Sequence, residues 1–236
     1  MKNKILLIDK LLKKKFGTPK RSKKPPDPVD LLIATILSQN TNDKNSYRAF
    51  QNLKGKYHAW KDVAELRTSQ IEKLIKVAGL GKQKSKAIKN LLVSLIKEKE
   101  EVSLKHLRKM KNEEILDELI EFPGIGVKTA SCVLLFSLRR NVCPVDTHVH
   151  RTLNRIGIVR TSSPGKTFYS INKNLPEKVA HSFHTNLIRL GREVCKPANP
   201  NCKACPVLSI CKFENKNLNV NKKNTAENSF MLLDNV

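Results

Sequence analysis

The chain has 236 residues, a length that suits one or two domains and buries enough apolar surface to fold without disulfides. Lys and Arg number 45 against 21 Asp and Glu, so the formal net charge is +24, and a protein this basic usually binds nucleic acid or an anionic membrane. A mean hydropathy of −0.41 excludes a multi-span membrane protein. An aromatic content of 5% leaves too few rings for a generic single-strand binder.

The N-terminal segment, residues 1–17, predicts an amphipathic helix. Its apolar residues recur at helical spacing with lysines between them, and it has neither the apolar core nor the cleavage site of an export signal. We therefore expect a cytoplasmic, nucleoid-associated protein with no membrane contact, and the sequence is also compatible with a nuclear location. Residues 20–28 combine charge with three prolines and predict a linker.

Apolar periodicity typical of helices begins at Val29 and continues through most of the chain. Helices are expected near residues 29–38, 42–54, 69–77, 83–98, 112–121, 127–138, 146–156, 165–174 and 179–190. Because no alternating segment is flanked by hairpin turns, the fold class is all-α. Residues 214–236 are rich in Asn and Lys and predict a disordered tail. The last eight residues are more apolar and could form a frayed helix or a docking peptide.

A Gly/Pro-rich turn separates the helices predicted at 112–121 and 127–138, and it contains Pro123, Gly124, Ile125 and Gly126. Proline ends the first helix, and the glycines permit positive φ and close approach of another backbone. The amides that begin the second helix would point outward at its positive end, which favours a phosphate of DNA or RNA. The same residues also suit an ordinary tight turn between packed helices.

Lys128 lies in the first turn of that second helix, where a cation is electrostatically disfavoured and a neutral amine would be a nucleophile. The helix from Lys128 to Arg139 is about 18 Å long, and the extended segment after it can retrace that distance. Asp146 can therefore return to the same end of the hairpin as Lys128. Asp146 also suits the N-cap of the next helix.

Four of the six cysteines are clustered in the sequence, with the spacing C-x6-C-x2-C-x5-C. These are Cys195, Cys202, Cys205 and Cys211. In a chain without an export signal a metal site is favoured over disulfides. The compact spacing favours a [4Fe–4S] cluster over zinc, which usually pairs two knuckles across a longer gap. Interleaved lysines, Lys203 among them, would present positive charge to phosphates. Cys132 and Cys143 lie in apolar contexts and predict buried side chains.

Together these residues resemble the endonuclease III family of base-excision DNA glycosylases, within the helix-hairpin-helix superfamily. The resemblance covers roughly residues 29–213. FPGIGVKTA is similar to the family's hairpin, with Lys128 at its catalytic lysine. VDTHVHRTLNRIG is similar to its aspartate segment, with Asp146 at the catalytic carboxylate. The cysteine spacing is similar to its iron–sulfur loop.

The resemblance implies two helical lobes that flank a DNA groove. A six-helix barrel would span residues 29–140, with the helix-hairpin-helix at 112–138. Residues 141–213 would form the iron–sulfur lobe, against which the N-terminal helix in residues 1–28 would pack. The expected partner is double-stranded DNA with damaged bases or abasic sites, bound by a monomer.

The implied activity is excision of oxidised pyrimidines from duplex DNA by base flipping. Lys128 would attack C1′ and form a Schiff base, β-elimination would nick the strand, and Asp146 would stabilise the developing charge. Hairpin residues Gly124, Ile125 and Gly126 would contact the DNA backbone.

Two further positions are similar to residues that the family inserts into the duplex. In LSQNTND, Asn40 aligns without gaps to the glutamine that fills the space of the flipped base, whereas residue type favours Gln39. Leu80, in the GLG turn, resembles the second intercalating position, and it equally suits a core leucine.

Other functions stay open at this point. A mismatch adenine glycosylase usually lacks the lysine and carries a further C-terminal domain. A thymine- or uracil-mismatch glycosylase has no such distinguishing feature in the sequence. A non-catalytic iron–sulfur redox sensor would explain the charge, the hairpin and the cysteines, but not Lys128 together with Asp146.

Overall fold

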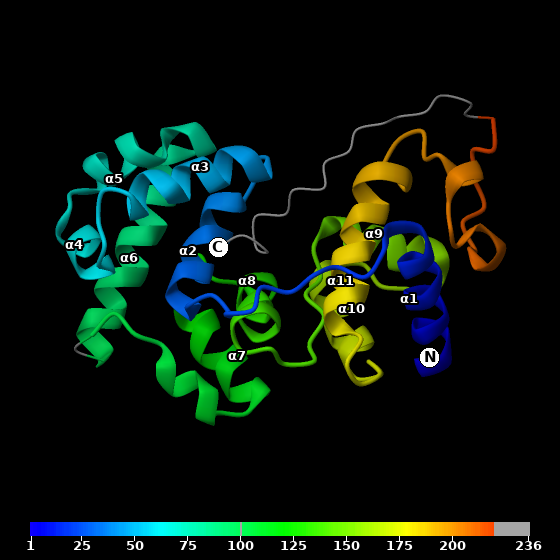
Figure 1. Ribbon diagram of the computed structural model, residues 1–236, viewed down its shortest axis with the longest axis horizontal. Helices are drawn as coiled ribbons and strands as arrows, with labels where there is room; N and C mark the ends of the chain where they lie inside the picture. Colours follow the sequence, from blue (N-terminus) through cyan, green and yellow to red (C-terminus); the bar gives the residue numbers. More distant parts are fainter. Residues whose placement is uncertain (100, 220–236) are drawn as a thin grey trace. The chain divides into compact units, whose positions relative to one another are not determined.

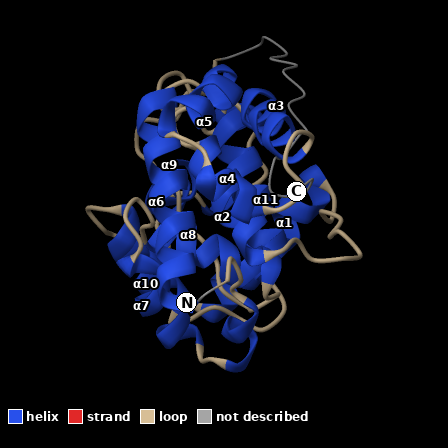
Figure 2. Ribbon diagram, turned by 90° about the vertical axis from the view of Figure 1, so that its left-hand side faces the viewer, coloured by secondary structure: helices blue, strands red, loops and turns tan. Residues whose placement is uncertain are grey.

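The computed structural model of the protein describes residues 1–99 and 101–219, and in that part of the chain every regular element is a helix (Figure 2). The prediction of an all-α fold is confirmed. Within the same residues, no helix combines the length and the apolar character needed to cross a lipid bilayer.

The chain divides into two units. The continuous unit comprises the described residues between 22 and 140. The split unit joins residues 1–21 to the described residues from 141 onward. The two ends of the described chain therefore fold together in one unit, and the middle of the chain forms the other.

In the split unit, the N-terminal helix packs against a helix from far along the chain (α1 and α11, Figure 1). Ile5, Ile8 and Leu12 of α1 are completely buried, and the buried carboxylate of Asp9 accepts a hydrogen bond of 2.7 Å from Ser182 of α11. The elements of this unit are α1 (Lys2–Phe16), α9 (Thr147–Ile156), α10 (Pro164–Asn172), α11 (Ala180–Arg189), the π-helical η4 (Leu190–Val194), and the 3-10 helices η5 (Cys202–Ala204) and η6 (Leu208–Ile210).

The continuous unit is built around one apolar helix, α2 (Pro28–Ser38), which contacts α3, α6 and α8. The side chain of Asp27 caps α2 by accepting a bond of 2.9 Å from the Val29 amide, and Pro28 takes the first helical position. A helix that is apolar on all sides requires a central place. The other elements are α3 (Asp43–Lys54), α4 (Trp60–Glu65), α5 (Thr68–Ile75), η1 (Lys76–Ala78), α6 (Gly81–Lys99), η2 (Lys105–Lys109), α7 (Asn112–Glu121), α8 (Val127–Cys132) and the π-helical η3 (Val133–Ser137).

The structure differs from the sequence prediction mainly in short or irregular elements. The six-residue helix α4 and the 3-10 helices were not predicted, because they are too short for apolar periodicity to show. The helix predicted at 127–138 begins as α8 and continues as the π-helical η3. A π turn is not visible in the 3.6-residue pattern.

Residues 214–219 do not form a free tail, although the sequence predicted disorder from residue 214. The backbone amide of Cys202 donates to the carbonyl of Asn217 at 3.1 Å, so this segment pairs with the cysteine loop. The remainder of the predicted tail, including the apolar last eight residues, lies outside the described residues.

Candidate functional site

The Gly/Pro-rich turn forms a tight hairpin between α7 and α8. The amide of Ile125 donates to the carbonyl of Phe122 at 3.0 Å, and Gly124 has φ of +86°. Pro123, Gly124 and Gly126 are exposed. The side chain of Ile125 is 4% exposed, and its amide is used within the turn. It anchors the hairpin to the core and leaves the two glycines at the surface.

Lys128 is the second residue of α8, directly after this hairpin. Gly126 is the N-cap of the helix, and the Lys128 side chain is half-buried. The backbone around it is fixed, since the hydroxyl of Ser131 donates to the Lys128 carbonyl at 2.9 Å. A lysine in the first turn of a helix, directly after an exposed Gly/Pro turn, suits a nucleophile that follows a turn favourable to a phosphate.

Asp146 is the N-cap of α9, as the sequence predicted. One carboxylate oxygen accepts a bond of 2.8 Å from the Val149 amide, and the side chain remains half-buried. Capping uses one oxygen, so the second can take part in chemistry.

Two side chains fix the extended segment that leads to Asp146. Asn172 of α10 bonds both the amide of Cys143, at 2.7 Å, and its carbonyl, at 3.0 Å. His184 of α11, which is 1% exposed, bonds the carbonyl of Pro144 through Nδ1 at 2.9 Å. The sequence analysis identified neither residue as functional. Their bonding partners lie 29 and 40 residues away in the sequence, so no local pattern marks either side chain.

Lys128 belongs to the continuous unit and Asp146 to the split unit. Both predicted catalytic groups lie at the start of a helix.

The two candidate DNA-inserting turns are both exposed and both strained. Gln39 and Asn40 follow the end of α2, and Leu80, which is 50% exposed, precedes α6. Asn40 has φ of +51° and Leu80 has φ of +48°, a left-handed conformation that is uncommon for residues other than glycine. The exposure of Leu80 removes the alternative that it is a core leucine.

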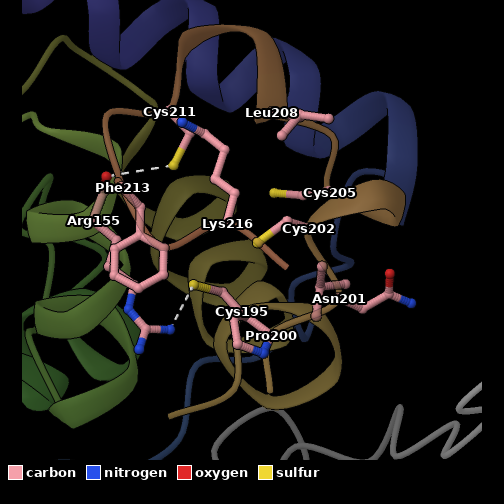
Figure 3. A pocket seen from close by; sticks show the side chains of 11 residues that line it. Arg155, Cys195, Pro200, Asn201, Cys202, Cys205, Leu208, Cys211, Phe213 and Lys216 are labelled. Carbon is pink, nitrogen blue, oxygen red and sulfur yellow. Dashed lines mark hydrogen bonds between the residues drawn. The ribbon is translucent and has the colours of Figure 1, made fainter. Parts of the chain in front are cut away.

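The four clustered cysteines line one pocket in the split unit (Figure 3). Cys195 follows η4, Cys202 lies in η5, Cys205 follows η5, and Cys211 follows η6. In the described residues no three Cys, His, Asp or Glu side chains form a group that could enclose a single metal ion. The sulfur atoms stand around the pocket rather than meeting at one point (Figure 3).

Arg155 of α9 forms one wall of this cysteine pocket. Its guanidinium lies 3.6 Å from the sulfur of Cys195, donates to the Lys196 carbonyl at 2.7 Å, and stacks 4.3 Å from the ring of Phe213. Burial, with smaller contributions from the neighbouring thiols, raises the pKa of the Cys205 thiol to about 11. A thiolate at that position therefore requires a bound cation, which is the electrostatic condition of a metal site.

Lys203, the lysine predicted to contact phosphates, is exposed in η5, next to Cys202 in the sequence. Its side chain is available to a polyanion.

The chain is similar to DNA repair proteins in sequence and in structure. Residues 33–177 match the model of the HhH-GPD superfamily of base excision DNA repair proteins. Endonuclease III of Thermotoga maritima is 33% identical over 207 residues, which cover 88% of this chain and 93% of the relative. The chain belongs to the endonuclease III family.

Two solved structures of endonuclease III are also similar to this chain. One is a non-covalent complex with DNA, and the other is a trapped covalent intermediate with DNA. Each has a TM-score of 0.76 and 28% identity, and each covers 90% of this chain, with 95% and 96% of the solved chain respectively. Endonuclease III proteins generally carry a [4Fe–4S] cluster.

Proposed function

We propose that the protein is a bifunctional DNA glycosylase and AP lyase of base excision repair. It removes oxidised pyrimidines from duplex DNA and nicks the resulting abasic site. The observation that carries this proposal is Lys128 at the start of α8, directly after an exposed Gly/Pro hairpin. Similarity to an endonuclease III trapped covalently on DNA supports a covalent step.

The chemistry follows from the Lys128 amine, carried at a helix start directly after the Gly/Pro hairpin. The lone pair of Lys128 Nζ attacks C1′ of the flipped nucleotide, and the C1′–N bond breaks, so the base leaves with that electron pair and is protonated. The sugar ring opens to an imine between Nζ and C1′. Loss of a proton from C2′ then expels the 3′ phosphate, which is β-elimination. Hydrolysis of the imine restores the amine.

Asp146 stabilises the positive charge that develops on the sugar and accepts the proton of the attacking amine. A fixed carboxylate does this without reorganisation, which lowers the barrier more than it raises affinity. The bonds from Asn172 and His184 to the preceding segment keep that carboxylate in place.

The cofactor of the proposal is one [4Fe–4S] cluster held by Cys195, Cys202, Cys205 and Cys211. Four thiols arranged around a pocket suit four irons with one thiolate each. When bound, the cluster would cross-link the loop and hold Lys203 in position toward the DNA backbone. Purified protein should be brown and contain about four irons per chain. Stoichiometric zinc without iron in protein prepared anaerobically would contradict this assignment.

The deciding experiment is borohydride trapping on a duplex that contains an abasic site. The wild-type protein should give a covalent adduct, because borohydride reduces the imine to a stable amine. Lys128→Gln should bind the same duplex and give no adduct. Lys61→Gln, at an exposed position of α4, removes the same charge and should trap normally.

Undiminished trapping by Lys128→Gln would remove that residue from the mechanism. Absence of an adduct with the wild-type protein would favour a glycosylase without lyase activity or a non-catalytic DNA-binding protein. The proposed partner is damaged double-stranded DNA, and the proposed location is the cytoplasm, with the nucleoid.

A further inference from the structure

Lys84 is a buried lysine that the proposed chemistry does not use. It lies in the first turn of α6 and is 2% exposed. Lysine is rarely buried unless its amine is paired, because an unpaired polar group loses its hydration without compensation. Here the amine donates to the carbonyl of Leu37 and to the carbonyl of Ala78, both at 2.8 Å. Burial also lowers the pKa of Lys84.

The two accepting carbonyls belong to the ends of two different helices. Leu37 is the penultimate residue of α2, and Ala78 is the last residue of η1. Carbonyls at helix ends have no partner within their own helix, so a donor from elsewhere fixes the direction in which the chain leaves. Lys84 therefore joins two helix ends that are 41 residues apart in sequence (78 − 37).

Each of these helix ends leads directly into one of the strained, exposed turns. Asn40 is three residues after Leu37, and Leu80 is two residues after Ala78. Both have positive φ, a conformation that persists only when the surrounding structure enforces it. The shared amine of Lys84 supplies part of that enforcement to both turns at once.

The same helix also contacts the hairpin. Ala87 lies three residues after Lys84, on the same face of α6. A side chain added at Gly124 would lie 3.6 Å from the Cβ of Ala87, so the hairpin backbone packs against this helix. The start of α6 therefore links three exposed turns of the continuous unit: residues 38–42, 79–81 and 123–126.

We propose that Lys84 is a positioning residue for base extrusion, which holds the Asn40 and Leu80 turns at a fixed separation so that both enter the duplex together. The inference rests on the proposed function and adds a residue to it. Flipping requires that the inserted side chains match the spacing of the emptied base stack. A preformed spacing avoids the loss of conformational freedom that two independent loops would suffer on binding.

The test compares two substrates for one variant. Lys84→Met keeps most of the side-chain volume and removes both donors. Single-turnover rates at saturating protein are measured on a duplex with thymine glycol opposite adenine and on the same duplex with an abasic site. Extrusion is harder for the stacked, paired base, so the variant should lose about tenfold or more on thymine glycol and much less on the abasic site.

Matched controls separate positioning from charge and from stability. Lys86→Met, two residues away and exposed, removes the same charge and should leave the ratio of the two rates unchanged. Circular dichroism and thermal melting show whether Lys84→Met is folded. If Lys84→Met does not fold, the ratio of the two rates is measured on Lys84→Gln, whose side chain keeps a hydrogen-bond donor but is shorter. Hydrogen exchange should increase in residues 38–42 and 79–81 of the folded variant and stay unchanged in α8.

A folded variant whose two rates fall in equal proportion, or do not fall, overturns the positioning role. A wild-type protein that neither excises thymine glycol nor nicks the abasic site overturns the proposed function instead. The two failures are therefore distinguishable in the same experiment.

Discussion

Replacement of Asp146 separates its structural role from its chemical role. As the N-cap of α9, its carboxylate accepts the Val149 amide at 2.8 Å and faces the positive end of the helix. Asparagine caps as well as aspartate does, so Asp146→Asn should lose only the charge–dipole attraction, about 0.5 kcal/mol. Asp146→Ala should lose the cap as well, about 1 kcal/mol more.

These free energies predict distinct melting temperatures. For a chain of this size, 1 kcal/mol corresponds to a shift of about 2–4 °C. Asp146→Asn should therefore melt about 1–2 °C below wild type, and Asp146→Ala about 3–6 °C below. Both variants lack the charged carboxylate, so both should lose about 100-fold or more in single-turnover excision.

The assay pairs thermal melting with excision of thymine glycol at saturating protein, and binding to uncleavable abasic DNA is measured in parallel. Binding should change little, because the carboxylate acts on charge that exists only in the transition state. If Asp146→Asn cuts at a near-normal rate, or if the rates of the two variants follow their melting temperatures, then Asp146 is a structural cap and not a catalytic group.

Three further predictions concern other parts of the molecule. Lys203→Ala should weaken binding to damaged and undamaged duplexes by similar factors. In a salt titration, the slope of log K against log salt should become shallower by up to about 0.9. An unchanged slope would show that this lysine contacts no phosphate. Gly191→Ala should destabilise the protein by about 1–3 kcal/mol in urea titrations, because the new Cβ would lie 2.7 Å from the Cβ of His148. An unchanged free energy of unfolding would mean that α9 shifts freely. Burial lowers the pKa of His148, so protonation favours the unfolded chain and the free energy of unfolding should fall as pH drops below about 6.5. The His148→Gln variant should lose less of its free energy of unfolding between about pH 7 and 5.5. Equal losses in the two proteins would contradict this prediction.

The sequence predicted the residues whose signals are local. Lys128 follows a Gly/Pro turn within a few residues, and Asp146 precedes a helix whose start it caps, so both could be found along the chain. The four cysteines fall within 17 residues, as counted from Cys195 to Cys211. Long helices such as α2 and α6 were predicted because their apolar positions repeat over several turns.

Residues whose role depends on distant partners could not be predicted. Lys84 is one lysine among many, and its burial depends on the carbonyl of Leu37, 47 residues earlier. His184 bonds a carbonyl 40 residues before it. The left-handed conformation of Asn40 has a weak local signal, because asparagine tolerates positive φ, whereas that of Leu80 has none. Tertiary contacts determine the conformation and burial of such residues, and the spacing of residues along the sequence does not reveal those contacts.

The split unit has a consequence for synthesis of the protein on the ribosome. The apolar face of α1 is covered by α11, and the Asp9–Ser182 hydrogen bond spans 173 residues. At about 5–20 residues per second, the first helix waits on the order of 10–30 s before its partner helix exists. The continuous unit can fold completely during that interval. Until α11 has been synthesised, the nascent chain therefore carries an exposed amphipathic helix, which ribosome-associated chaperones would be expected to bind.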